Sequence, residues 1–196
     1  MHKSKIKIWE LSLLIALCIS LCEATVEAGR LSELSEKIVR MHVIADSDAA
    51  AAQQLKERVR IALEPLVSEL MADAESAGEA EEKLRSNEEA LLAAAYEAAG
   101  GERVELCLGR ETYPYRRTEH YALPVGEYTS LRIILGSGEG HNWWGVIFPQ
   151  LDASAAYSEA MNVLDEEELR LIYDEDGVVV RFRFLELFEE FRRLFR

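Results

Sequence analysis

The spacing of hydrophobic residues changes several times along the chain, and each change marks a different kind of element. Residues 11–22 form a mostly apolar run. Alternation of apolar and other residues over 38–45 predicts a strand. Apolar residues three or four positions apart then predict two helices, over 49–70 and 78–99. Alternation returns between residues 104 and 149 and predicts a block of strands.

The two predicted helices each have one apolar face and recognisable ends. The apolar face of the first consists of Leu55, Val59, Leu63, Val67 and Leu70. We expect Asp48 to cap this helix and Pro65 to kink or break it. The apolar face of the second consists of Leu84, Leu91 and Ala95. Gly100 and Gly101 should end the second helix.

The order of elements favours an α+β domain. The strand block contains the extended runs 104–108, 113–124, 131–135 and 145–149. Residues 153–173 have a helical pattern, and "GVVVRFRF" at 177–184 predicts a further strand that leads into an amphipathic, aromatic end. We therefore expect an antiparallel or mixed sheet with helices packed on one face.

The N-terminal residues indicate export. Lysines precede the apolar run, which has the length of a signal-peptide core and is short for a membrane span. Val26 and Ala28 suit the −3 and −1 positions of an export cleavage site. We expect residues 1–28 to be a signal peptide and 29–196 to be a single exported domain, with no stable membrane insertion after cleavage. An uncleaved N-terminal anchor is the alternative.

Charge and cysteine content narrow the class of partner. The formal net charge is −14, and the predicted signal peptide contains equal numbers of lysines and glutamates. The exported part therefore carries all of this charge, which argues against nucleic acid and anionic membranes as partners. Cys18 and Cys22 lie within the signal core. Cys107 is the remaining cysteine, so the exported domain has no internal disulfide.

A glycine-rich stretch, "GSGEGHNWWGVIFPQ" at 136–150, raises the question of a nucleotide site. A phosphate-binding loop needs a helix directly after its glycines, so that backbone amides face the phosphate. Here a loop and strand pattern follows, and no lysine stands where a phosphate loop requires one. This stretch is therefore a glycine-shaped loop that leads into a strand.

Histidines supply the candidates for metal or hydrolytic chemistry. His42, His120 and His141 lie in the exported part, and Asp46 follows His42. On a strand His42 and Asp46 would face the same side, which permits a zinc site without requiring one. No two histidines share a helical turn, and the serines stand among turn residues. We predict no catalytic, cofactor-binding or metal-binding residue and no enzymatic activity, with a metal-dependent hydrolase as the weaker alternative.

The adjacent tryptophans are the clearest candidates for binding. Neighbouring residues on a strand face opposite sides, so one ring can fill the core while the other faces a partner or a sugar. Trp144 shares a side with Val146 and is the expected buried member. Trp143 shares the other side with Ile147 and is the expected outward member. Burial of both rings is the ordinary alternative.

Several stretches together resemble stage II sporulation protein R, a family of endospore-forming bacteria. They are "MHVIADSD" at 41–48, "YPYRRTEHYALPVGEYTSLRIILGSGEGHNWWGVIFPQL" at 113–151, and the closing strand with its aromatic tail. The resemblance implies a protein made in the forespore and exported into the space between the two membranes. There it would trigger a mother-cell membrane aspartic protease, through the extracytoplasmic part of that protease, to mature a sigma-factor precursor. A secreted carbohydrate-binding module for the cell wall is the alternative.

The residues singled out above become candidates for partner binding, and the chain departs from the family pattern in one respect. The candidates are His42, Asp46, His120, His141, Asn142, Trp143 and Trp144. Family members usually have a cysteine after the tryptophan pair and a second after an "FPPL"-like segment. Here Gly145 and Asp152 occupy these positions, and Gln150 replaces the second proline. If the family's cysteines form a disulfide, this chain lacks it, and we expect lower local rigidity with an unchanged fold.

Overall fold

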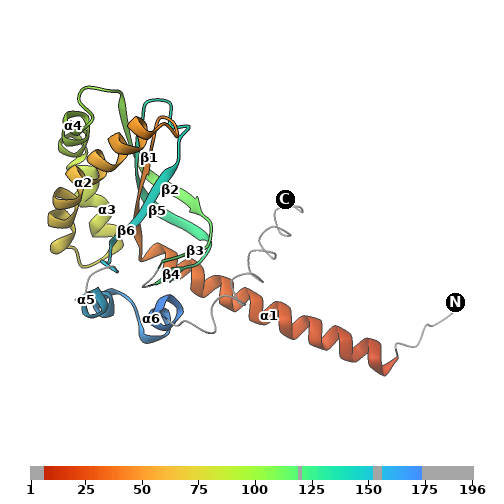
Figure 1. Ribbon diagram of the computed structural model, residues 1–196. Helices are drawn as coiled ribbons and strands as arrows, with labels where there is room; N and C mark the ends of the chain where they lie inside the picture. The colour runs from red at the N-terminus through yellow and green to blue at the C-terminus, as the bar shows by residue number, and fades with distance from the viewer. Residues whose placement is uncertain (1–6, 119–120, 152–155, 174–196) are drawn as a thin grey trace.

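The computed structural model describes residues 7–118, 121–151 and 156–173 (Figure 1). Its elements are α1 (Ile8–Glu36), β1 (Val39–Ile44), α2 (Ala50–Ala72), α3 (Ala77–Ser86), α4 (Glu88–Ala98), β2 (Val104–Tyr113), β3 (Arg116–Arg117), β4 (Ala122–Leu123), β5 (Gly126–Leu135), β6 (Asn142–Phe148), α5 (Ala156–Val163) and α6 (Glu166–Tyr173). The predicted strand at 177–184 and the aromatic tail lie outside the described residues.

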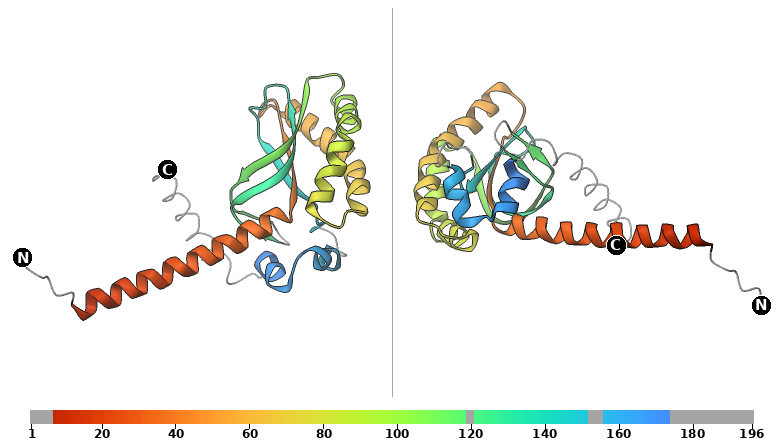
Figure 2. Two further views of the ribbon diagram at one scale, coloured as in Figure 1. Left: turned by 180° about the vertical axis from the view of Figure 1, so that it is seen from behind. Right: turned by 90° about the horizontal axis from the view of Figure 1, so that it is seen from below.

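A four-stranded mixed sheet forms the centre of the domain, with the strand order β2-β5-β1-β6. β1 runs parallel to β5, whereas β2 and β6 run antiparallel to their neighbours. β3 and β4 pair separately as a small second sheet. Helices α2, α3 and α4 lie together on one side of the large sheet (Figures 1 and 2). The expectation of an α+β domain with a mixed sheet is confirmed.

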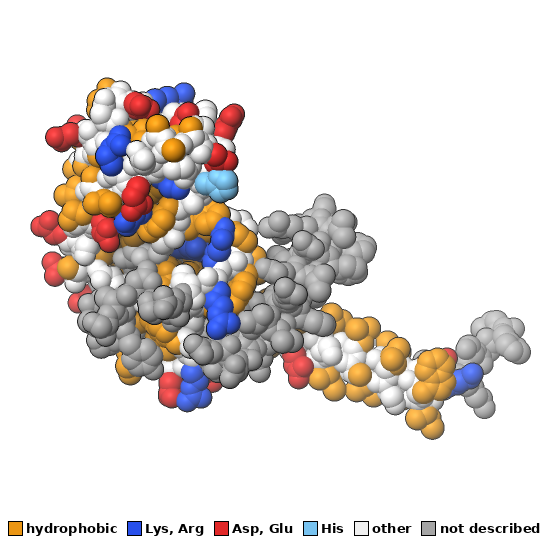
Figure 3. Space-filling model, viewed as in Figure 1, with side chains coloured by type: hydrophobic (Ala, Val, Ile, Leu, Met, Phe, Trp, Pro, Cys, Tyr) orange, Lys and Arg blue, Asp and Glu red, His pale blue; other side chains and the backbone are white. Residues whose placement is uncertain are grey.

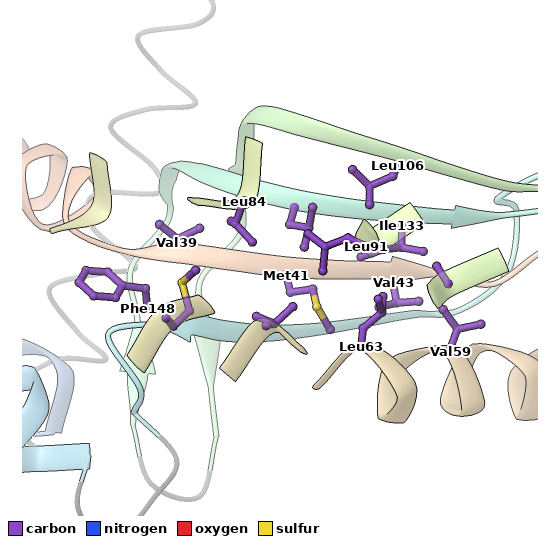
Figure 4. Close-up of a cluster of buried hydrophobic side chains, with 14 of the residues drawn as sticks. Val39, Met41, Val43, Val59, Leu63, Leu84, Leu91, Leu106, Ile133 and Phe148 are labelled. Carbon is purple, nitrogen blue, oxygen red and sulfur yellow. The ribbon is translucent and has the colours of Figure 1, made fainter. Parts of the chain in front are cut away.

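The main core lies between the sheet and helices α2 to α4. The buried face of α2 consists of Leu55, Val59, Leu63, Val67 and Met71, which differs from the expected face only at its end, where Leu70 is half-buried. Figure 4 shows Val59 and Leu63 pointing toward Met41 and Val43 of β1. Each such fully buried aliphatic side chain contributes about 1.5–3 kcal/mol. This layer anchors β1, the strand that carries the first family-like motif.

A second apolar cluster covers the opposite side of the sheet. It combines residues from the end of α1, from β2, β4 and β5, from α5 and α6, and from the segments between these elements: Leu34, Ile38, Tyr113, Tyr121, Leu123, Tyr128, Leu151, Ala160, Leu164, Leu169 and Ile172. Trp144 and Val146 of β6 pack against it. Both faces of the sheet are therefore covered over part of their area, and polar groups on this second face are removed from water.

Local sequence preferences fail at three places. The expected helix over 78–99 is divided at Asn87, whose side chain donates to the Lys83 carbonyl at 2.8 Å and competes with the helix backbone. Pro65 does not break α2. The carbonyl of Ile61 that loses its amide partner belongs to a residue 54 % exposed, so water can satisfy it. Asp48 does not cap α2, because Ala49 occupies the cap position and Asp48 bonds elsewhere.

Helix α1 continues from the apolar N-terminal run into the domain. It is long and apolar enough to cross a membrane. Figure 3 shows apolar side chains covering the part of α1 that projects from the domain. Its last turns are buried through Leu31 and Leu34. Such a helix is consistent with a signal peptide and with export. Cleavage after Ala28, within this helix, stays a prediction.

Candidate functional site

The two family-like motifs form one structural unit at the end of the β1–β6 pair. β1 ends at Ile44, and the turn that follows is held against the loop at 136–141. The Asp46 carboxylate accepts from the Ser137 amide at 2.7 Å, and the Ser137 hydroxyl donates to the Asp46 carbonyl at 2.9 Å. The Gly140 amide donates to the Ala45 carbonyl at 2.8 Å. We call this arrangement of residues 45–48 and 136–141 the loop lock.

Glycines are required where the loop lock is tightest. Gly136 has a φ of +59°, in the left-handed region, and a side chain there would collide with the Asp46 carboxylate. A side chain at Gly140 would collide with the carbonyl of Ser47. The glycine spacing is therefore explained by close packing of two loops rather than by a phosphate, in agreement with the sequence analysis.

His141 and Asn142 emerge from the loop lock toward solvent. The His141 side chain is 80 % exposed, and its Nδ1 pairs with the Asp48 carboxylate. The His141 amide also donates to Asp48, at 2.7 Å. These two hydrogen bonds lower the pKa of Asp48. Lys56 of α2 donates to the His141 carbonyl at 3.0 Å. The loop thus presents a His–Asp pair on the surface, next to the exposed Asn142 that opens β6.

His42 belongs to a different place, a buried polar network on the second face of the sheet. It is only 5 % exposed, and its Nδ1 lies 3.0 Å from the Glu111 carboxylate of β2. The Ser130 hydroxyl donates to the same carboxylate at 2.9 Å. The Tyr113 hydroxyl lies 2.6 Å from the Ser130 hydroxyl. Three neighbouring strands, β1, β5 and β2, therefore meet through side chains as well as through their backbones.

The directions of these hydrogen bonds follow from their chemistry. A carboxylate only accepts, so Ser130 must donate its proton to Glu111. Tyr113 must then donate to Ser130, and His42 must carry a proton on Nδ1. Burial lowers the pKa of His42, against the opposing effect of Glu111, so the ring is neutral and Nε2 is an acceptor. No described group donates to this buried Nε2.

Arg40 lies beside the network and is the most unusual residue on this face. It is 2 % exposed, and its guanidinium carbon lies 3.8 Å from the centroid of the Tyr113 ring and 5.1 Å from that of Tyr128. Within the described ranges, its Nε and Nη1 have no hydrogen-bond partner. Burial lowers the pKa of Arg40. Among the described residues, contacts with aromatic faces thus stand in place of the carboxylate that a buried arginine usually has.

The tryptophans face opposite sides of β6, as expected. Trp143 and Ile147 pack against the main core, whereas Trp144 and Val146 pack against the second cluster. The expected contrast in burial is wrong, because both rings are half-buried. β6 lies at the edge of the sheet, where neither side of a strand is fully covered. Arg60 lies 5.2 Å from the centroid of Trp143.

Gly145 is shaped by its neighbour Trp143. The two residues lie on the same side of β6, and a side chain at Gly145 would collide with the indole ring. The ring of Trp143 thus lies across the position where the resemblance implies a cysteine. Asp152, at the second such position, lies outside the described residues.

The structure does not place His42 and Asp46 on one face of a strand, the arrangement that would have permitted a metal site. β1 ends two residues before Asp46, whose carboxylate is held by the loop lock. Over residues 7–118, 121–151 and 156–173, no three histidine, cysteine, aspartate or glutamate side chains gather as a metal site. His120 is outside these ranges. The structure therefore separates the candidates into an exposed pair, His141 and Asn142, two half-buried tryptophans, and the buried His42.

Sequence reasoning missed the partners of His42. Glu111, Ser130, Tyr113 and Arg40 were not among the candidates, although they make the most extensive buried polar contacts of the described chain. The available signal was the alternation of β1 itself. Arg40 and His42 share one face of a strand whose other face is wholly apolar, which indicates polar partners on that side.

The fold and the site together define a class: an α+β domain behind an N-terminal apolar helix, with a buried polar network and a locked surface loop. The family model described as "Stage II sporulation protein R (spore_II_R)" matches residues 35–157, which is more than half of the chain. The chain therefore belongs to the stage II sporulation protein R family, and the resemblance is confirmed. This range includes β1, the network and the loop lock.

A curated relative agrees with this assignment. The chain is 30 % identical over 122 residues to "Stage II sporulation protein R" of Bacillus subtilis (strain 168). The alignment covers 60 % of this chain and 54 % of the relative, so the match spans about half the length of that protein. No solved structure matches the chain.

Proposed function

We propose that this protein is an exported sporulation signal, made in the forespore, that activates a membrane aspartic protease of the mother cell. The protease then cleaves a sigma-factor precursor. The space between the two membranes is where the two proteins meet. In this role the chain acts by binding, and the protease performs the chemistry.

Family membership is the observation that carries this proposal, because the match includes both motifs of the loop lock. Two structural features support it. The apolar start of α1 suits export. The titratable groups of the network are directed at one another: both oxygens of Glu111 accept, from Ser130 and from His42. Ser130 is 1 % exposed and donates to a carboxylate instead of to a histidine, which differs from the arrangement of a nucleophilic serine.

Carbohydrate binding has less support from the tryptophans. A sugar ring stacks on an open aromatic face. An arginine lies over each of the two rings, Arg60 at 5.2 Å from Trp143 and Arg116 at 4.0 Å from Trp144. Gly145 also packs closely against the Trp143 ring, and the His42 ring lies 5.3 Å from the Trp144 ring. Neither tryptophan therefore offers the flat platform that this alternative requires.

Reconstitution in a non-sporulating bacterium tests the proposal. The host would express the full chain, the protease and the sigma-factor precursor, and precursor cleavage would be followed by immunoblot. We expect cleavage only when all three are present. A chain that lacks residues 1–28 is the matched control, because it keeps the domain but should not leave the cytoplasm. A protease with its catalytic aspartate replaced controls for host proteases. Failure of the complete set to cleave the precursor would overturn the proposal, and binding to purified cell wall would then be measured.

A further inference from the structure

β6 is an edge strand whose outer side has no partner in the described structure. The order β2-β5-β1-β6 places it at the end of the sheet, where it pairs with β1 alone. No backbone hydrogen bond joins its other side to any of the described residues. Such a side presents amide and carbonyl groups in the spacing that an added strand would match.

The two edges of the sheet differ in how they are protected. β2, at the opposite edge, carries exposed charged side chains at Glu105 and Arg110. β6 has the sequence "NWWGVIF" and contains neither a charged residue nor a proline. Charges and prolines are the usual means by which edge strands avoid pairing with another chain. The sequence therefore protects one edge with charges, and the other edge is open to an incoming strand as far as the described residues show.

A groove lies between this open edge and α2. Its volume is about 380 Å³, and its walls include Arg60 and Val67 from α2 and Trp143 and Ile147 from β6. The Trp143 ring lies across Gly145 and forms part of the wall. Strand addition obtains affinity from backbone hydrogen bonds and selectivity from pockets for alternate side chains. A groove of this kind suits one apolar side chain of an added strand.

We propose that β6 and the α2–β6 groove receive an extended segment of the partner protein, which adds to the sheet and inserts an apolar side chain beside Trp143. This inference rests on the proposed function, in which the partner is the extracytoplasmic part of the protease. A second copy of this chain is the less suitable occupant, because each copy carries a net charge of −14 and the two would repel. The segment should accordingly be apolar and free of acidic residues.

Matched lysine substitutions on the two edges test the inference. Ile147 of β6 and Leu108 of β2 are both half-buried, and both pack against the main core. Ile147→Lys places a charge in the groove, whereas Leu108→Lys makes the same change at the other edge. Binding of each exported variant to the detergent-solubilised protease would be measured by biolayer interferometry. We expect Ile147→Lys to weaken binding at least about 10-fold, since a central interface residue carries this much or more, and Leu108→Lys to have little effect.

A second variant and two further measurements ensure that each result either supports or rejects the docking site. If Ile147→Lys does not fold, Trp143→Leu removes the groove wall at a smaller structural cost and takes its place. Equal binding by the β6 and β2 variants, or no binding by the wild type, would overturn the docking site. Light scattering would show whether the wild type is a dimer and whether Ile147→Lys abolishes it. That result would assign the β6 edge to self-association and would also overturn the docking site. Precursor cleavage that persists with Ile147→Lys rejects this edge alone, whereas absence of cleavage with the wild type rejects protease activation itself.

Discussion

Replacing Ser130 by alanine should destabilise the domain because Ser130 joins two otherwise separate polar groups. Its hydroxyl donates to Glu111 at 2.9 Å and accepts from Tyr113 at 2.6 Å. Ser130→Ala leaves the Tyr113 hydroxyl, on a side chain that is 1 % exposed, without an acceptor. An unsatisfied buried hydroxyl costs about 1–3 kcal/mol, and the lost hydrogen bond to a charged group adds about 1.5–3 kcal/mol. We expect a total of about 2.5–6 kcal/mol.

A double-mutant cycle separates this explanation from simple loss of packing. Tyr113→Phe removes the donor and should cost only about 1 kcal/mol, because Ser130 keeps its bond to Glu111. In the double variant no hydroxyl is left unsatisfied. Its cost should therefore fall short of the sum of the single costs by about 1–2 kcal/mol. Thermal or urea unfolding of the exported protein measures these differences, and the thermal midpoint of Ser130→Ala should fall by about 5–24 °C.

Ser35→Ala is the matched control. Ser35 is buried to a similar degree, but its hydroxyl donates only to the Ser32 carbonyl within α1. We expect its replacement to cost less than about 1 kcal/mol, since no second side chain loses a partner. If Ser130→Ala costs no more than this control, or if the costs of Ser130→Ala and Tyr113→Phe simply add, the connected network does not exist as described.

Further predictions concern the remaining special residues. Arg40→Met should leave stability unchanged or raise it by about 1–3 kcal/mol in urea unfolding, since unpaired donors are removed and the apolar stem is kept; a loss above 2 kcal/mol would reveal a partner for the guanidinium. Because burial lowers the pKa of His42, the unfolded chain takes up a proton near pH 6.5 before the folded chain does, so stability should decrease as the pH falls below about 6.5. His42→Gln should remove this part of the pH dependence, and an unchanged slope would contradict the assignment. Gly145→Ala should destabilise the domain by about 1–3 kcal/mol through collision with Trp143, whereas Gly109→Ala, where the new methyl group meets nothing within 4 Å, should not. N-terminal sequencing of the exported protein should begin at Gly29, and a sequence that begins at Met1 would favour an uncleaved anchor.

Features encoded by nearby residues could be predicted from the sequence. The apolar face of α2 follows from a spacing of three or four residues, and the structure buries Leu55, Val59, Leu63 and Val67 as expected. The opposite orientation of Trp143 and Trp144 follows equally from the two-residue period of a strand. The loop that presents His141 could be predicted because three closely spaced glycines favour a tight loop and no helix pattern follows them.

Features that depend on the order of strands in the sheet could not be predicted from the sequence. His42 and Glu111 are 69 positions apart, and their contact requires β5 to lie between β1 and β2. Nothing in either segment alone specifies that order. Asp48 is a second example, in which a long-range contact overrides a local preference. Its local context favours a helix cap, but a partner 93 positions away, His141, takes its carboxylate. A tertiary contact therefore determines the role of Asp48, although its local sequence favours a helix cap.

The loop lock and the proposed docking edge are physically linked. The Gly140 amide bonds to Ala45, and the His141 amide bonds to Asp48, so the contact between the two chain segments extends beyond the ends of β1 and β6. A slip of one residue in this pairing would move Trp143 to the other face of the sheet and remove it from the groove. The lock therefore fixes the register that builds the groove. This explains why a motif with two tightly packed glycines and a mostly structural Asp46 directly precedes the strand proposed to meet the partner.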